Sequence, residues 1–161
     1  MKPLALLASL LLIASPVFAE PVTVKGPTGQ TLILTAADLA ALPRVKVTFS
    51  AHGETHDYEG PLLIDVLAKV GAPTAKSLRG PALAEVVLVT AADGYRVAFG
   101  LAEADPGTRP NRIILADRMD GKPMDAKTGP FKLVIEGDLR PARGVKRVTS
   151  IEVIDLGKPA P

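Results

Sequence analysis

Apolar residues along the chain either alternate with polar ones, which predicts β-strands with one buried face, or form short continuous runs, which predict strands buried on both faces. About nine such segments occur, separated by turn-forming glycine, proline and aspartate. They span residues 22–24, 31–34, 45–49, 56–59, 85–91, 95–99, 113–116, 131–136 and 148–154. The first two are expected to form a hairpin. The fifth and sixth are expected to form another, near the centre of the fold.

Helical spacing is confined to two or three short segments. Thr35 stands three residues before Asp38, a variant of the capping box that predicts a helix ending before Pro43. Between residues 63 and 70, leucine and valine recur at helical intervals until Gly71. Residues 101–105 form at most one further turn. Because the helices are mixed with the strands and do not alternate with them, the pattern predicts an α+β fold.

Residues 117–130 contain the turn formers Asp120, Gly121, Pro123, Gly129 and Pro130. This composition predicts a long loop with neither helix nor strand. Loops of this length usually have a function.

The first nineteen residues have the pattern of a cleavable signal peptide. Lys2 precedes an apolar run over residues 4–14, and Ala19 ends a small-residue cleavage site. The run is shorter than the roughly 20 residues of a transmembrane helix. We therefore expect residues 20–161 to form a single domain, with a core over residues 31–154, that is exported to the periplasm and not embedded in the membrane.

The composition excludes several classes of function. The chain contains no cysteine, which excludes a disulfide scaffold, a cysteine nucleophile and a thiolate metal site. The 19 basic side chains include Lys2, so the mature chain would carry 18 against 17 acidic ones. This near balance argues against nucleic acid as a partner.

Positive charge nevertheless gathers in one segment. Arg140, Arg143, Lys146 and Arg147 follow one another with no acid among them. In an irregular loop, their side chains and nearby backbone amides could hold a phosphate or carboxylate. The same run is also typical of a solvated basic surface, and both interpretations stay open.

The two histidines, His52 and His56, lie on either side of a predicted turn. They are either exposed surface residues or, if their rings meet across the turn, ligands of a metal together with Glu54 or Asp57. No serine lies in a Gly-x-Ser-x-Gly turn, so hydrolase chemistry has no support.

Five segments together resemble the oxidoreductase molybdopterin-binding domain of the sulfite oxidase type. They are Tyr58 to Leu63, Ala92 to Tyr95, Ile114 to Met124, Gly129 to Gly137, and Arg143 to Lys146 before the last strand. The resemblance covers residues 31–154 and implies a mixed-sheet α+β fold whose loops hold a pyranopterin that binds molybdenum.

The resemblance also implies functional positions and shows where this chain departs from them. Arg143 and Lys146 match family positions near the cofactor phosphate and pterin. Where the family commonly has His-Gly-x-Pro-x-Arg, this chain has Thr128 to Lys132, so a lysine replaces an arginine that can bind phosphate through two donors. The cysteine thiolate that such enzymes give molybdenum is missing.

The predicted leader gives a second argument on the cofactor. It contains no arginine, whereas a twin-arginine signal exports folded proteins. The resemblance implies that molybdenum cofactor is inserted in the cytoplasm, so a chain exported unfolded is expected to arrive without it.

We therefore predict a non-catalytic, exported domain with no catalytic residue, no metal ligand and no bound cofactor. It binds a small anionic ligand, or a periplasmic or membrane protein partner, and its predicted ligand-binding residues are Arg143, Lys146, Lys132 and Arg140. The alternative is a molybdopterin-dependent oxidoreductase that exchanges electrons with a membrane partner. A third hypothesis, a histidine-based metal carrier, requires His52 and His56 to converge.

Overall fold

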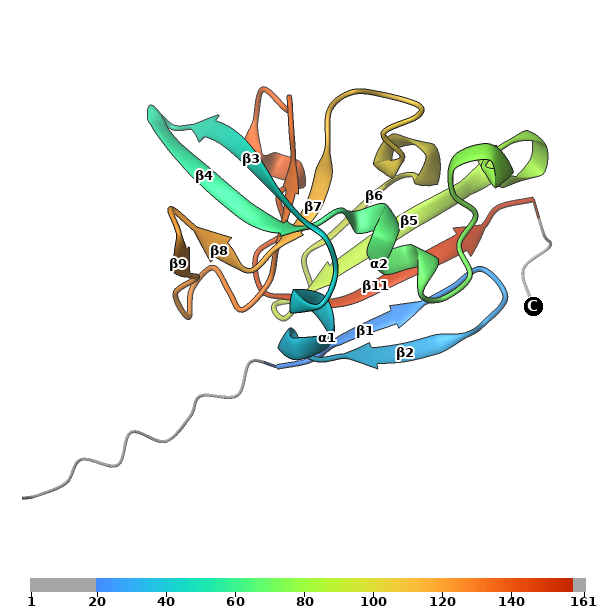
Figure 1. Ribbon diagram of the computed structural model, residues 1–161, viewed down its shortest axis with the longest axis horizontal. Coiled ribbons are helices and arrows are strands. Elements are labelled where there is room, and N and C mark those ends of the chain that lie inside the picture. The colour runs from blue at the N-terminus through green and yellow to red at the C-terminus, as the bar shows by residue number, and fades with distance from the viewer. Residues whose placement is uncertain (1–19, 158–161) are drawn as a thin grey trace, which may run out of the picture.

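The structure, a computed structural model, describes residues 20–157, so the predicted signal peptide lies outside the described residues. These residues form eleven strands, two α-helices and four short 3₁₀ helices (Figure 1). The strands are β1 (Val22–Lys25), β2 (Thr31–Leu34), β3 (Arg44–Ala51), β4 (Glu54–Pro61), β5 (Glu85–Ala91), β6 (Arg96–Gly100), β7 (Ile113–Ala116), β8 (Arg118–Met119), β9 (Lys122–Pro123), β10 (Lys132–Ile135) and β11 (Val148–Asp155). The helices are α1 (Ala36–Ala40), α2 (Leu63–Ala68), η1 (Ala75–Ser77), η2 (Gly80–Ala84), η3 (Leu101–Ala104) and η4 (Pro141–Arg143). The α+β class and all nine predicted strands are confirmed.

The largest sheet has five strands in the order β2-β1-β11-β5-β6. The last strand of the chain, β11, inserts between β1, to which it is parallel, and β5, to which it is antiparallel. The prediction that the β5–β6 hairpin is central was therefore wrong for β6, which forms an edge. Local alternation indicates a strand but not its neighbours in a sheet, because β1 and β11 are separated by most of the chain.

A four-stranded sheet has the order β3-β4-β8-β9. Its last two strands correct the prediction that residues 117–130 contain no strand. In β8, Arg118 pairs with Glu59 of β4 and with Pro123 of β9. Strands of two residues are too short to show an alternation, so only the free edge of β4 makes this segment extended.

Strands β7 and β10 form an antiparallel pair between two apolar cores. Leu115 and Leu133 face the larger core, whereas Ile114 and Val134 face a smaller one that contains Tyr58. Burial on both faces explains why β7 consists of apolar residues alone.

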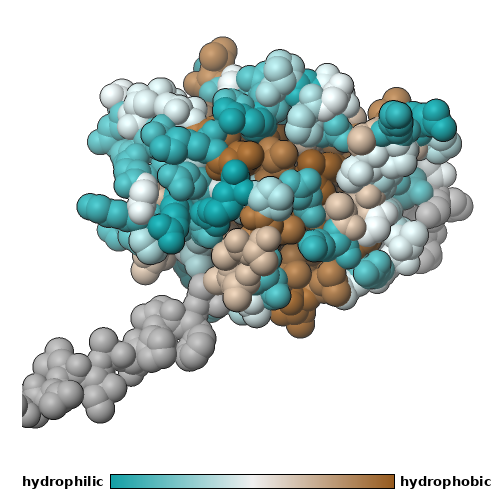
Figure 2. All heavy atoms as spheres, in the orientation of Figure 1, coloured by the Kyte–Doolittle hydropathy of each residue, from teal (hydrophilic) through white to brown (hydrophobic). Residues whose placement is uncertain are grey.

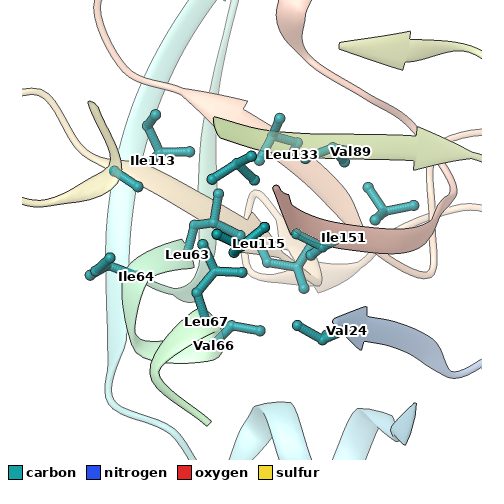
Figure 3. Packing of buried hydrophobic residues seen from close by; sticks show 14 of the residues in the cluster. Val24, Leu63, Ile64, Val66, Leu67, Val89, Ile113, Leu115, Leu133 and Ile151 are labelled. Atoms are coloured by element: carbon teal, nitrogen blue, oxygen red, sulfur yellow. The ribbon is translucent and has the colours of Figure 1, made fainter. Parts of the chain in front are cut away.

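Helix α2 covers the larger core. Its side chains Leu63 and Leu67, both with no exposed surface, lie beside Leu115 of β7 and Ile151 of the five-stranded sheet (Figure 3). On the surface, apolar side chains gather in the middle and lower part of the face shown in Figure 2, with polar ones around them. No helix within residues 20–157 is long and apolar enough to cross a membrane.

Gly60 explains the close approach of β4 to β7. A Cβ atom at this position would collide with the backbone of Leu115 and Ala116. Across this approach the amide of Asp117 donates to the carbonyl of Glu59 at 3.0 Å. The glycine therefore lets β4 place Tyr58 against the β7–β10 pair.

Candidate functional site

The structure divides the four predicted ligand-binding residues into two environments. Arg143 lies between two carboxylates. Its Nε and Nη2 donate to Asp138 at 3.0 and 2.6 Å, and its Nη1 donates to Glu103 at 3.1 Å. The bonds to Asp138, and then those to Glu103, raise the pKa of the Arg143 guanidinium. The side chain is thus held by acids from outside the basic segment.

Lys132, at the start of β10, has a different environment. Its Nζ donates to the Tyr58 hydroxyl at 2.8 Å and lies 4.1 Å from the centre of the Tyr58 ring. Within residues 20–157 its ammonium pairs with no carboxylate. Burial, and then the nearby charge of Lys146, lower the pKa of Lys132 to about 8. A half-buried ammonium without a counter-charge is an unusual feature, because burying an unpaired charge costs free energy.

Tyr58 supplies the acceptor for this ammonium. Burial, and then the charge of Asp120, raise the pKa of the Tyr58 phenol above its ordinary value. The phenol is therefore neutral near pH 7 and binds Lys132 through its oxygen lone pairs and its ring face.

Arg140 and Lys146 complete the cationic group. Arg140 and Lys132 line the same small cleft, together with Phe49, Gly144 and Asp138, whose carboxylate is bound to Arg143. Lys146 is exposed and close enough to Lys132 to lower its pKa. In the described part of the chain, neither Arg140 nor Lys146 forms an ion pair. Lys132, Arg140 and Lys146 therefore lie in one region, and none of them has a carboxylate partner within residues 20–157.

The histidines occupy separate surroundings. His56 bonds to Asp120 through Nδ1 at 2.7 Å and approaches Glu54 through Nε2 at 3.5 Å. His52 lies exposed in the β3–β4 turn with a positive φ of 55°. Residues 20–157 contain no group of three or more histidine, aspartate or glutamate side chains placed to hold a metal. The metal-carrier hypothesis thus finds no support in the described structure.

The sequence matches the family described as "Oxidoreductase molybdopterin binding domain" over residues 20–160. The chain belongs to this family. A similar solved structure is the sulfane dehydrogenase SoxCD from Paracoccus pantotrophus, with a TM-score of 0.65 and 17% sequence identity. The match covers 84% of this chain and 38% of the SoxCD chain, so this chain spans well under half of that protein. The comparison with curated proteins finds no match.

The residues of this molybdopterin-binding domain that match cofactor positions of the family do not, in their present arrangement, fit the cofactor, although a separate cavity of about 720 Å³ is lined by Gly129, Pro130 and Phe131. The chain offers no cysteine thiolate. The cleft at Lys132 and Arg140 has a volume of about 10 Å³, which is room for about one water molecule. Arg143, at a family position near the cofactor, is bound to Asp138 and Glu103. We therefore derive no chemical step through molybdenum or the pterin.

The cations of this site could be identified from the sequence, but the residues that bind them could not. Tyr58 was part of the family resemblance, yet no local pattern relates it to Lys132, which lies 74 positions away. Glu103 is likewise 40 positions from Arg143.

Proposed function

We propose that this molybdopterin-binding domain works without molybdenum, as an exported binding protein that holds a small oxyanion at Lys132. Export rests on the predicted leader in residues 1–19. The observation that carries the binding proposal is the half-buried Lys132 ammonium, which contacts Tyr58 and no carboxylate among residues 20–157.

The carboxylate that lines the cleft, Asp138, is already paired with Arg143, so an oxyanion would supply a counter-charge to Lys132. Lys132, Lys146 and Arg140 would all be attracted to it, and charge-assisted bonds to lysine and arginine are among the stronger polar contacts in proteins. Arg143 acts differently in this proposal: through Asp138 it fixes the loop that carries Arg140. The cleft itself has room for about one water molecule, so the anion would lie at its mouth, against the exposed side chains of Arg140 and Lys146.

Calorimetric titration of residues 20–161 with inorganic phosphate and with sulfate tests the binding site. We expect Lys132→Met to weaken binding at least tenfold, because it removes the central cation. Lys76→Met is the matched control, since Lys76 is an exposed lysine of η1. Equal binding by wild type and Lys132→Met, or no binding by wild type, would overturn the proposal.

Metal analysis separates this function from the oxidoreductase alternative. The protein purified from its native host is expected to contain neither molybdenum nor pterin. Stoichiometric molybdenum would establish the alternative and remove the proposed one, whatever the phosphate titration shows.

A further inference from the structure

A cavity of about 720 Å³ lies at the segment between β7 and β10, and its wall shares no residue with the cleft at Lys132. Phe131, Pro130 and Met124 contribute to its wall together with Arg118 and Arg147. Lys132 does not line it. The volume falls within the range of about 300–1,000 Å³ that is usual for small-molecule sites.

Two carboxylates in the wall already have partners. Asp117 receives two hydrogen bonds from the guanidinium of Arg44, one of them 3.0 Å long. Asp125 accepts from the Thr128 amide at 2.8 Å, and its bonds to Thr128 hold the pKa of this carboxyl below its usual value. The third acid of the wall, Glu20, is exposed.

The two arginines of the wall have no such partners. Within residues 20–157, neither Arg118 nor Arg147 forms an ion pair, in contrast to Arg44, Arg109, Arg112 and Arg143. A guanidinium with free donors binds a carboxylate through two parallel hydrogen bonds. Both arginines are exposed and line the same cavity, so both are available to an anionic group bound there.

The backbone holds both arginines in place. Arg118 is paired on both sides, with Glu59 and with Pro123. Arg147 has a positive φ of 49°. Its amide donates to Thr128 at 3.0 Å, and its carbonyl accepts from Ala92 at 2.9 Å. The positions of the two Cα atoms are therefore set by the fold before any ligand binds, whereas the two side chains are exposed and become ordered on the ligand.

The rest of the wall is suited to an apolar group. Phe131 is only 1% exposed and belongs to the larger core, so it forms a rigid part of the wall. Met124 packs against the smaller core and has a flexible side chain that adapts to the shape of a ligand.

We propose that this cavity binds an organic anion, a carboxylate carried on an apolar body of aromatic size, with the carboxylate held by Arg118 and Arg147. The apolar body lies against Phe131, Pro130 and Met124. This site is separate from the oxyanion site at Lys132 and does not depend on it.

Binding of 2-naphthoate to residues 20–161, measured by calorimetry, tests this proposal. Arg118→Gln and Arg147→Gln are each expected to weaken binding about tenfold, the effect of losing one charge-assisted contact. Arg79→Gln serves as the matched control, because Arg79 is exposed and lies outside the cavity wall. Thermal unfolding of each variant shows that it is folded.

Two further ligands and one further variant test which groups of the ligand and which residues of the protein are needed for binding. The neutral 2-naphthamide is expected to bind at least tenfold more weakly than 2-naphthoate, and acetate, which lacks the apolar body, is expected to bind weakly too. Lys132→Met should leave naphthoate binding unchanged, which separates this site from the proposed function. The proposal is overturned if naphthoate does not bind, if naphthamide binds equally well, or if the double variant of Arg118 and Arg147 retains wild-type affinity.

Discussion

The charged side chains at the two ends of strand β10 differ in whether they form ion pairs. Beyond its last residue, Arg112 donates to Glu136 at 2.8 and 2.6 Å, and Arg143 is bound to Asp138. At its first residue, Lys132 contacts a phenol and no carboxylate in the described structure. One end is thus a network of ion pairs, and the other is a group of unpaired cations.

The difference separates charges that hold the fold from charges that are available to a ligand. The sequence from Arg140 to Arg147 contains no acid, yet Arg143 is neutralised by Asp138 and Glu103. Lys132 lies between Phe131 and Leu133 and is not part of a charge run. The lesson is that a cation is free for binding only if no acid from another part of the chain reaches it.

The largest expected effect on the free energy of unfolding comes from removing an ion pair beyond the last residue of β10. Asp138→Asn should lower the free energy of unfolding by about 2 kcal/mol, because it leaves the part-buried guanidinium of Arg143 without its main partner. Urea denaturation measures the loss. The control is Glu152→Gln, whose pair with Lys25 is exposed (35% and 49%) and is worth less than about 1 kcal/mol. Equal losses in the two variants would contradict the distinction between the ends.

A smaller effect on the free energy of unfolding, of opposite sign, is expected at Lys132, the first residue of β10. Lys132→Met replaces a half-buried ammonium with an apolar side chain of similar length, so stability should stay equal or rise by up to about 1 kcal/mol. The same replacement at Arg143 should destabilise the protein. Urea midpoints of the two variants decide this, and a clear loss of stability in Lys132→Met would show that its contact with Tyr58 outweighs the cost of burial.

The pH dependence of stability sharpens the comparison further. The pKa of Lys132 is lowered from 10.5 to about 8 in the folded protein. Between these values the unfolded chain binds more protons, so the contribution of Lys132 to stability should rise with pH in this window. The difference in unfolding free energy between wild type and Lys132→Met, measured at about pH 7 and about pH 10, reports this contribution. A difference that does not change with pH would refute the lowered pKa.

The smallest effect is expected at His56, an exposed member of a pair on the β4–β8 edge. Its bond to Asp120, and then its contact with Glu54, raise the pKa of His56. The stabilisation by this pair is therefore complete below the unfolded pKa, about 6.5, and disappears as the pH rises through the higher folded value. His56→Gln should remove this dependence. Nuclear magnetic resonance titration of the ring checks the direction, and a folded pKa at or below the ordinary value would contradict it.

Much of the fold could be predicted from the sequence because its signals are local. The alternation in residues 85–91 and 148–154 defines two strands, and both are present. The capping box of Thr35 and Asp38 forms as the spacing indicates, with the Thr35 amide donating to Asp38 at 2.8 Å. In each case the interacting groups are a few residues apart, so the sequence contains the whole interaction.

The candidate site could be predicted only in part. The cations were visible as residue types, and the family resemblance directed attention to Lys132, Arg143 and Lys146. Their partners could not be found, because Glu103 and Tyr58 reach them through space from distant strands and helices. For the cavity at Arg118 and Arg147, the sequence indicated the length of the segment between β7 and β10 and placed Arg147 in the basic segment, but not that the two arginines line one space.

The sequence by itself determined nine of the eleven strands in the described part of the chain, but not β8 and β9, and it determined helices α1 and α2 and the lack of a thiolate for a metal. Only the tertiary structure decided that β11 lies between β1 and β5, that Arg143 is paired, and that Lys132, Arg118 and Arg147 form no ion pair within residues 20–157. The physical reason is the range of the interactions. Backbone conformation follows from neighbours along the chain, whereas the state of a charge depends on every group that folding brings near it.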